Sequence, residues 1–244
     1  LAEIESRIAL KEAYEAANKA NRAKTEFLSN MSHDIRTPMN AIVGMTAIAG
    51  ANIDHQDRVI DCLGKITKSS RHLLSLINEV LDMSRIENGK IELTEEDFNL
   101  AELVDNLIAM TRSEIEAHHH NFEVRLNKIE HEYVRGDSLR VQQVFTNIMS
   151  NAIKYTPDGG SITMRFGEEP AEADKKLTCL VFCVSDTGIG MTPEYQDRMY
   201  QSFSREINTQ VNRTLGSGLG LAIVRQMVDL MGGTITCESE VEKG

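Results

Sequence analysis

The stretch NMSHDIRTPMNAI, residues 30–42, decides how the first part of this chain folds. Its composition favours a helix, yet Pro38 lies inside it and His33 is followed at once by an acid, Asp34. Proline cannot donate a backbone hydrogen bond and its ring crowds the carbonyl four residues earlier, so we expect the helix to bend at Asp34. Alone, the stretch favours a surface histidine before a kink. A chemical role for the histidine requires a reaction partner elsewhere in the chain.

Helical patterns extend to both sides of this stretch. Residues 1–30 are rich in Ala, Glu and Lys, and a second helix is expected from about residue 55 to 88, after a break at 50–56. Both carry residues at heptad spacing: Ala9, Ala13, Ala16, Ala20, Ala23 and Phe27 in the first, and Val59, Leu63, Ile66, Ser70, Leu73, Ile77, Val80 and Ser84 in the second. The alanine seam fits a dimer contact and plain helix propensity equally well. Because one antiparallel hairpin buries little surface, we expect a four-helix bundle made by a homodimer.

Composition and charge narrow the class of protein. Hydrophobic residues make up 41% of the 244 residues and charged residues 26%, with a net charge of −11, which argues against a nucleic-acid-binding groove. No apolar run reaches the roughly 18 residues that span a bilayer, and the N-terminus lacks a signal-peptide pattern. The four cysteines show no CxxC spacing, and Cys179 and Cys183 lie in an apolar run where buried free thiols are expected, which suggests a reducing compartment. We therefore expect a cytoplasmic location, including the cytoplasmic part of a membrane-bound sensor, and a fragment of a longer chain.

The pattern changes near residue 88, where helices begin to alternate with strands. Helices are expected at 100–118, 138–155 and 219–231, and strands at 121–127, 161–167, 177–186 and 233–240. This order predicts a two-layer α/β sandwich with a mixed sheet. The triple histidine at 118–120 is interpreted as a solvated helix end in preference to a metal site, because adjacent residues diverge on a helix.

The helix at 138–155 carries two stripes. One is apolar and typical of a core face, and the other is formed by Asn147, Asn151 and Lys154 at i, i+4 and i+7. Amide oxygens can ligate Mg²⁺ and lysine can bind phosphate. Taken alone, the second stripe fits a solvent-facing polar edge equally well.

Two glycine-rich stretches follow. In VSDTGIGM, 184–191, a buried strand ends in Asp186, and Gly188 and Gly190 open a loop whose backbone can approach a flat ring. In LGSGLGLAIV, 215–224, a run of alternate glycines (Gly216, Gly218 and Gly220) leads into a helix, where free N–H groups can bind phosphate. Each stretch alone is also explained by a tight turn.

Together, and in this order, the motifs are specific. The chain resembles the sensor histidine kinases of two-component signalling over essentially its whole length, with SHDIRTP similar to their H box, NIMSNAIKYT to the N box, and DTGIGM and GSGLGLAIV to the two glycine boxes. The stretch 24–42 is similar to the hybrid subgroup. The resemblance implies a dimerisation and histidine phosphotransfer domain at 1–90 and a catalytic ATP-binding domain of the Bergerat fold at 97–244. It also implies a response-regulator receiver domain as partner.

The resemblance further implies a role for each matching residue. His33 is the phosphoacceptor with Asp34 as its acid-base neighbour, and Thr37 positions water for dephosphorylation of the regulator. Asn151 ligates Mg²⁺ with Asn147 nearby. The remaining ATP-binding residues are Lys154 at the phosphates, Tyr155 lining the site, Asp186 at the adenine amine, Gly188 and Gly190 in the adenine loop, and Gly216, Gly218 and Gly220 at the phosphates and the hinge of a lid spanning about 204–216.

Two departures and two competing hypotheses accompany this resemblance. YQSF, 200–203, departs from the family's F box, and the sequence ends at Gly244, where family members continue into one more strand. ATP hydrolysis, as in gyrase-type relatives, is disfavoured because Asn147 stands where those enzymes use a glutamate base. A non-catalytic scaffold is disfavoured because His33, Asn151, Asp186 and the glycines are all present. A hydroxyl at Thr37 also has a structural alternative, a hydrogen bond back to the helix carbonyl of His33.

Overall fold

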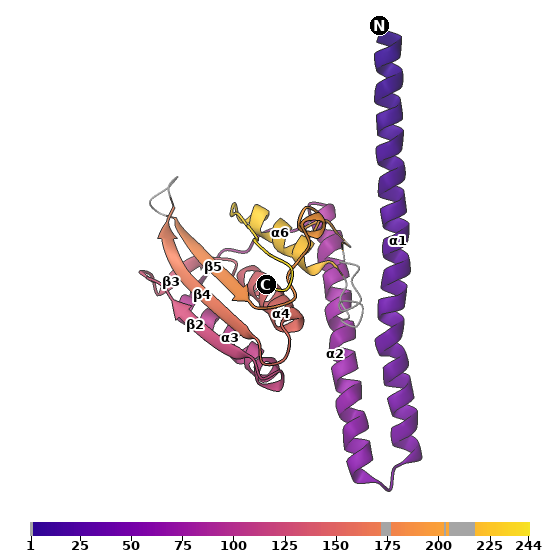
Figure 1. Ribbon diagram of the computed structural model, residues 1–244, viewed down its shortest axis with the longest axis vertical. Coiled ribbons are helices and arrows are strands. Elements are labelled where there is room, and N and C mark those ends of the chain that lie inside the picture. Colours follow the sequence, from indigo (N-terminus) through magenta and orange to yellow (C-terminus); the bar gives the residue numbers. More distant parts are fainter. Residues whose placement is uncertain (1, 172–176, 203, 205–217) are drawn as a thin grey trace. The chain divides into compact units, whose positions relative to one another are not determined.

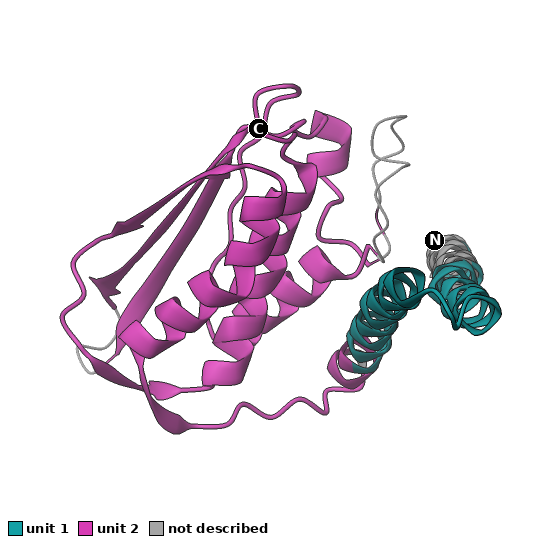
Figure 2. Ribbon diagram, turned by 90° about the horizontal axis from the view of Figure 1, so that it is seen from below, with its two compact units in different colours: residues 1–81, 215–217 teal, residues 82–214, 218–244 magenta. Residues whose placement is uncertain are grey.

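The computed structural model describes residues 2–171, 177–202, 204 and 218–244. The chain divides into two compact units, of which the first holds residues up to Leu81 and the second holds the described residues from Asp82 onward (Figure 2).

The first unit is a helical hairpin. Helix α1 (Ala2–Ala51) and helix α2 (Gln56–Glu87) run antiparallel and are joined by a short turn (Figure 1). This confirms the predicted hairpin and its break. Helix α1 continues through Pro38 without interruption, so the expected bend at Asp34 stays a prediction.

The buried face of the hairpin differs from the predicted seam. On α1 the fully buried residues Met31, Asp34 and Pro38 follow i, i+3, i+7, and on α2 Cys62 and Leu76 are buried. Of the eight predicted seam residues of α2, only half-buried and exposed side chains are found, and Leu63 and Ile77 are exposed. A dimer seam is expected to stay partly exposed in a single copy of the hairpin, so the seam of α2 stays a prediction, beside a buried stripe on an adjacent face of the helix. The side chains of the alanine seam of α1 lie outside the described residues.

The second unit contains a mixed three-stranded sheet. Strand β2 (Asn121–Leu126) pairs in parallel with β4 (Ser161–Pro170), which pairs antiparallel with β5 (Thr178–Asp186). The predicted mixed sheet is confirmed. A second small sheet is formed by β1 (Glu96–Asn99) and β3 (Tyr133–Gly136), and the sequence did not indicate β3.

Helices cover one face of this sheet (Figures 1 and 2). They are α3 (Leu100–Ala117), α4 (Ser138–Tyr155) and α6 (Gly220–Leu230), with a single short turn, α5 (Pro193–Gln196), after the glycine loop. At the centre of the core, the ring of Phe145 on α4 stacks on Phe182 with centroids 4.1 Å apart and meets Phe166 edge-on at 5.6 Å. This two-layer sandwich confirms the predicted fold class.

The strand expected at 233–240 does not form among the described residues. The polar groups at the end of this segment are used in other contacts: the Glu240 N–H donates to Gly244 O at 2.8 Å and the Glu242 N–H donates to Ile189 O at 2.8 Å. The segment therefore folds back as a turn onto the loop after β5, which replaces the ladder that the alternating sequence suggested.

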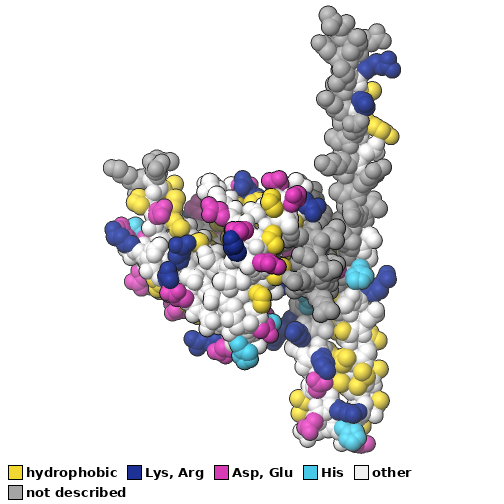
Figure 3. Space-filling view, viewed as in Figure 1, with side chains coloured by type: hydrophobic (Ala, Val, Ile, Leu, Met, Phe, Trp, Pro, Cys, Tyr) yellow, Lys and Arg dark blue, Asp and Glu magenta, His cyan; other side chains and the backbone are white. Residues whose placement is uncertain are grey.

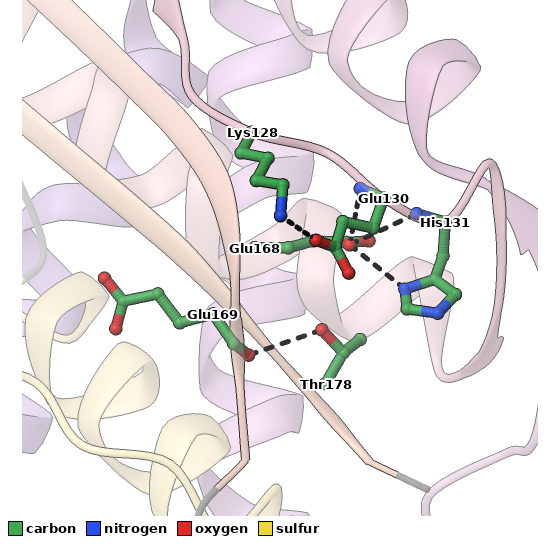
Figure 4. A network of polar contacts seen from close by, with 6 residues as sticks. All are labelled: Lys128, Glu130, His131, Glu168, Glu169 and Thr178. Carbon is green, nitrogen blue, oxygen red and sulfur yellow. Dashed lines mark hydrogen bonds and ion pairs between the residues drawn. The ribbon is translucent and has the colours of Figure 1, made fainter. Parts of the chain in front are cut away.

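A buried carboxylate fixes the loop at the opposite end of the sheet (Figure 4). Glu168 on β4 accepts hydrogen bonds from the backbone N–H groups of Glu130 (2.9 Å) and His131 (3.2 Å) and lies 3.1 Å from the His131 ring nitrogen. Lys128 forms an ion pair with Glu130 beside them. These contacts hold the segment between β2 and β3 against β4.

The triple histidine lies at the C-terminal end of α3. His118 and His119 are exposed, as predicted for a solvated helix end, and His118 Nδ1 lies 2.7 Å from Asp158. His120 is buried with its Nε2 3.2 Å from the Ile153 carbonyl, so the interpretation was wrong for this residue. Within the described ranges, no cluster of His, Cys, Asp and Glu side chains has the geometry of a metal site.

Candidate nucleotide and phosphotransfer sites

Helix α4 carries the polar stripe formed by Asn147, Asn151 and Lys154. Its N-terminus is capped by Asp137, whose carboxylate accepts from the Arg140 N–H at 2.9 Å. The apolar face is buried through Val144, Phe145, Met149, Ala152 and Ile153. Asn147, Asn151 and Lys154 are all half-buried, so this stripe is neither part of the core nor fully exposed to solvent.

The loop after β5 is built around Asp186. One carboxylate oxygen, Oδ1, accepts the Gly188 N–H at 2.9 Å, which leaves Oδ2 for an external donor. Burial raises the pKa of Asp186 above its ordinary value of 3.8, and the Gly188 N–H opposes this shift. A half-buried acid with one free oxygen is suited to accept a hydrogen bond from an amine.

Close backbone approaches explain both glycines of this loop. A Cβ on Gly188 would lie 2.8 Å from the Tyr155 carbonyl oxygen, and a Cβ on Gly190 would lie 2.0 Å from the Glu240 carbonyl oxygen. Gly190 also has a φ of 65°, which disfavours any residue with a side chain. The Ile189 N–H donates to Tyr155 O at 3.2 Å, so the loop lies directly against the end of α4.

The second glycine stretch lies beside the amide stripe. A Cβ on Gly220, the first residue of α6, would lie 3.8 Å from Asn147 Oδ1. The cap residue, Leu219, has no side-chain oxygen, so the first N–H groups of α6 remain suited to an acceptor from outside the helix. The start of α6 thus lies beside Asn147 in the middle of α4, and the loop after β5 lies against Tyr155 at the C-terminal end of the same helix. The Lys154 ammonium lies 4.8 Å from the centre of the Tyr155 ring at the same end of α4.

His33 and Asp34 have opposite exposures on α1. The His33 side chain is 74% exposed, whereas that of Asp34 is 6% exposed. The two are joined by a contact of 3.4 Å between His33 Nδ1 and Asp34 Oδ1. This contact turns Nδ1 toward the acid and leaves Nε2 accessible, which is the arrangement of a nucleophilic imidazole with a fixed carboxylate behind it.

Thr37 shares the exposed face with His33. Its hydroxyl donates to the His33 carbonyl at 3.1 Å, which is the structural alternative that the sequence left open. The side chain is exposed, and its hydroxyl can rotate to another acceptor. The observed hydrogen bond therefore accounts for a structural role of Thr37 and assigns it no reaction.

Comparisons with known proteins match both units. The model of the family "His Kinase A (phospho-acceptor) domain" matches residues 23–89, and that of the family "Histidine kinase-, DNA gyrase B-, and HSP90-like ATPase" matches residues 136–244. The chain is 37% identical over 241 residues to the sensor protein GacS of Pseudomonas syringae pv. syringae and 36% identical over 243 residues to the histidine-protein kinase BarA of Escherichia coli, in both cases over 99% of this chain. The chain belongs to the sensor histidine kinases.

The chain spans about a quarter of the length of these curated relatives, 26% of GacS and 25% of BarA. Solved structures share its fold. The ShkA structure in complex with AMPPNP has a TM-score of 0.62 at 24% identity, covering 89% of this chain and 43% of that chain. The histidine kinase AdeS of Acinetobacter baumannii has a TM-score of 0.57 at 21% identity, covering 86% and 93%. These structures confirm the predicted fold, and the match of residues 136–244 to the ATPase family model supports the use of ATP.

Part of the kinase site lies outside the described residues. This applies to Gly216 and to the lid expected between about 204 and 216, apart from Ser204. Gly218 is described and has a φ of 72°. In the departing F box, Tyr200 is half-buried and the Arg225 guanidinium lies 5.8 Å from the centre of its ring. Helices α1 to α6 include none, over the described residues, that is long and apolar enough to cross a membrane.

Two side chains that touch the glycine loop were not anticipated from the sequence of this kinase. The Ser239 hydroxyl accepts from the Met191 N–H at 2.9 Å, and the Gln196 side-chain amide donates to the Met191 carbonyl at 3.0 Å. Ser239 lies in the segment that was expected to form a strand, and Gln196 lies in a short polar helix. Neither position has a local motif, so no sequence signal identified them.

Proposed function

We propose that this chain is a protein-histidine kinase core that transfers the γ-phosphoryl group of ATP to His33 and then to an aspartate of a response-regulator receiver domain. The observation that carries this proposal is that the start of α6 lies beside Asn147 and the loop after Asp186 lies against Tyr155 on the same helix, together with an accessible His33 backed by a buried Asp34 in the other unit. The proposed domains are residues 1–90 for dimerisation and phosphotransfer and residues 97–244 for ATP binding.

The nucleotide is held along α4. We assign the adenine amine to Asp186 Oδ2, the shape of the adenine loop to Gly188 and Gly190, and the side of the site to Tyr155, whose carbonyl already contacts that loop. Lys154, which points over the Tyr155 ring, binds phosphate. The glycines Gly216, Gly218 and Gly220 bind phosphate through their N–H groups and act as the hinge of the lid.

The residues present fit a nucleotide-bound Mg²⁺. Asn151 lies one turn beyond Asn147 on the half-buried stripe of α4, and amide oxygens suit a hard cation that keeps phosphate and water as its other ligands. Bound there, Mg²⁺ would neutralise charge on the phosphates. Asn151 is the proposed ligand, and Asn147 lies between it and the start of α6.

The proposed reaction at His33 follows from the ring orientation. Nε2, which faces solvent, forms the new bond to the γ-phosphorus while the bond to the bridging oxygen breaks and ADP leaves. The proton on Nδ1 is stabilised by, or passes to, Asp34 as the ring gains positive charge. The N–H groups of the glycine stretch offset charge on the moving phosphoryl group. The phosphoryl group then passes from Nε2 to the carboxylate of the regulator, restoring the neutral ring.

The hairpin provides a surface for a second copy of the chain. Besides its buried stripe, α2 carries large apolar side chains that remain exposed: Ile60, Leu63, Leu74, Ile77 and Leu81. Their spacing is close to a heptad repeat, and apolar side chains gather on the lower half of the hairpin (Figure 3). A homodimeric four-helix bundle would bury this stripe. We further propose a cytoplasmic location, since the response regulator and ATP are both found there.

One pair of variants tests this function. Asn151→Ala should abolish binding of Mg²⁺-ATP, whereas His33→Gln should leave ATP binding intact and abolish labelling, because the two residues lie in separate units. The measurement is incubation with γ-labelled ATP, separating acid-labile label on the protein from free phosphate. Release of free phosphate without labelled protein would favour ATP hydrolysis, and an acid-labile label on His33→Gln would refute the assignment of the phosphoacceptor.

A phosphatase activity toward the phosphorylated regulator is a second candidate. The observation in its favour is that the Thr37 hydroxyl lies on the exposed face of α1 one turn after His33. An acyl phosphate is already reactive and mainly needs an oriented water, which a hydroxyl can hold.

A further inference from the structure

The adenine loop, residues 186–191, is held at its far end by two side chains, one from the nearby helix α5 and one from the distant segment 233–244. The Met191 N–H donates to Ser239 Oγ at 2.9 Å, and the Met191 carbonyl accepts from Gln196 Nε2 at 3.0 Å. Both backbone groups of one residue are thus bound by side chains rather than by a ladder or a helix. Backbone groups satisfied in this way depend on those two side chains for their position.

The Gln196 side chain is also bound to the segment of Ser239. Gln196 Nε2 donates to the Ser239 carbonyl at 2.9 Å, so a single amide joins α5, the loop and the segment 233–244. The Ser239 hydroxyl donates onward to the Gly244 carbonyl at 2.9 Å. We call this set of contacts between Gln196, Ser239 and Met191 the loop clamp.

The near end of the loop is fixed independently. Asp186 Oδ1 accepts from Gly188, and the Ile189 N–H donates to the Tyr155 carbonyl at the end of α4. Between the two ends, Gly190 is so close to the Glu240 carbonyl that a Cβ would lie 2.0 Å from it. The depth at which Gly188 and Gly190 meet a base is therefore set by where the clamp holds Met191.

We propose that Gln196 and Ser239 are positioning residues for the nucleotide, acting through Met191 on the adenine loop. The inference rests on the proposed ATP site and adds residues that neither glycine box contains. The clamp keeps the loop in its binding shape before ATP arrives, so that binding does not have to order it. If the loop held that shape only about a tenth of the time, the apparent affinity would fall about tenfold. The step at His33 takes place in the other unit and would not change.

The chemistry of the clamp dictates the variants. Gln196→Ala removes both donated bonds, and Gln196→Glu places a carboxylate against two carbonyl oxygens at nearly unchanged volume, so its effect should be larger. Ser239→Ala leaves the Met191 N–H without its acceptor, whereas Ser239→Thr retains a hydroxyl. Glu194→Ala, at an exposed position two residues from Gln196 on α5, is the matched control.

The test uses the full chain and ATP, with affinity from calorimetry and autophosphorylation rates over a range of ATP concentrations. We expect Gln196→Ala and Ser239→Ala to raise Kd and KM about 5- to 20-fold, with kcat within about twofold of the wild type. Ser239→Thr and Glu194→Ala should remain within about twofold in every constant. Hydrogen exchange of the Met191 amide in the absence of ATP should be faster in Ser239→Ala, which reports the clamp itself even if overall stability falls.

The outcomes separate the two ideas. A wild-type chain that does not bind ATP would overturn the proposed function and the clamp with it. A wild type that binds ATP, with clamp variants that bind equally well or that lose kcat at unchanged KM, would overturn the clamp alone. A loss of affinity in Ser239→Thr as large as that in Ser239→Ala would also overturn it, because the hydroxyl would then not be the group that matters.

Discussion

Replacing Asp186 by asparagine should separate the stability of the ATP-binding unit from its function. Asparagine has the same shape, and its oxygen can still accept the Gly188 N–H that Asp186 Oδ1 accepts at 2.9 Å. The other end of the side chain changes from an acceptor to an NH₂ donor. That group would face the adenine amine, which is itself a donor, so the fold is preserved and the recognition is lost.

The magnitude follows from the hydrogen bond that is removed. A hydrogen bond to a charged group contributes about 1.5–3 kcal/mol, which corresponds to a change in Kd of about 10- to 150-fold. Because two donors would also be forced together, we expect Asp186→Asn to weaken ATP binding by about 100-fold, measured by calorimetry.

The effect on stability has the opposite sign. Burial raises the pKa of Asp186 above 3.8, so the folded state binds this proton more tightly than the unfolded state. Below the pKa that Asp186 has in the unfolded chain, the residue is protonated in both states and does not change the free energy of unfolding with pH. As pH rises through the raised folded pKa, the charged form lowers the free energy of unfolding. The Asn variant carries no such penalty, so without ATP its Tm should equal or exceed that of the wild type, by a margin that grows as pH rises from 3.8 through the raised pKa of the folded state.

Asp158→Asn provides a control of opposite sign. The hydrogen bond from His118 lowers the pKa of Asp158, so this fully exposed acid favours folding above its ordinary pKa. Its replacement should reduce Tm slightly at neutral pH, or leave it unchanged, without altering ATP affinity. The reasoning about Asp186 would be refuted if Asp186→Asn lowered the Tm of the ATP-free protein together with its affinity, since Asp186 would then be a structural acid.

Three further predictions concern the other parts of the chain. Thr37→Ala should keep autophosphorylation and slow regulator dephosphorylation by about tenfold or more, and equal dephosphorylation rates with a cognate regulator would end that assignment. Phe145→Ala should lower the free energy of unfolding of the second unit by about 3–5 kcal/mol in urea titrations, because it removes the ring that contacts both Phe166 and Phe182. The control Leu139→Ala, at a 65% exposed position on the same helix, should change that free energy by less than about 0.5 kcal/mol. Ile77→Glu should shift the chain toward a monomer in light scattering, and a wild type that is monomeric at micromolar concentration would refute the proposed dimer.

Local signals were sufficient to predict α4 and the strands around it. Helix α4 spans the expected residues because an acid caps its first turn and its apolar face repeats at i, i+3 and i+4 up to Tyr155. Strand β5 could be recognised as a short apolar run that ends at Asp186. The amides and the lysine of α4 at helical spacing did not by themselves distinguish a binding site from a polar edge, and the roles predicted for them come from the resemblance to the sensor histidine kinases.

Periodicity could not predict which of the two apolar stripes of α2 is buried against α1. Helix α2 carries apolar residues on adjacent faces, such as Leu73 beside Leu74 and Leu76 beside Ile77. Neighbouring residues are about 100° apart on a helix, so both stripes satisfy a heptad pattern. Only packing against α1 decides that Leu76 is buried and Ile77 is exposed.

Long-range pairing also decided the elements that were missed. Strand β3 is four residues long and exists because it pairs with β1, which precedes it by more than thirty residues. The segment 233–240 alternates like a strand, but its end is held by Met191 and Gln196 instead of by a ladder. Contacts of this kind depend on the arrangement of whole segments, which a local pattern does not contain.

The exposed His33 and the buried Asp34 suit the phosphoryl transfer that we propose. A phosphoryl carrier that reacts first with ATP and then with a regulator must be reachable by two different partners, so its nucleophilic nitrogen has to face solvent. The acid that orients it must keep one position through both steps, which a buried side chain does better than an exposed one. Neighbouring positions on a helix differ by about 100°, so a single dipeptide supplies one exposed and one buried group. Asp34 lies in phase with the buried Met31 and Pro38, and His33 is thereby turned outward with Nδ1 toward the acid and Nε2 free to react.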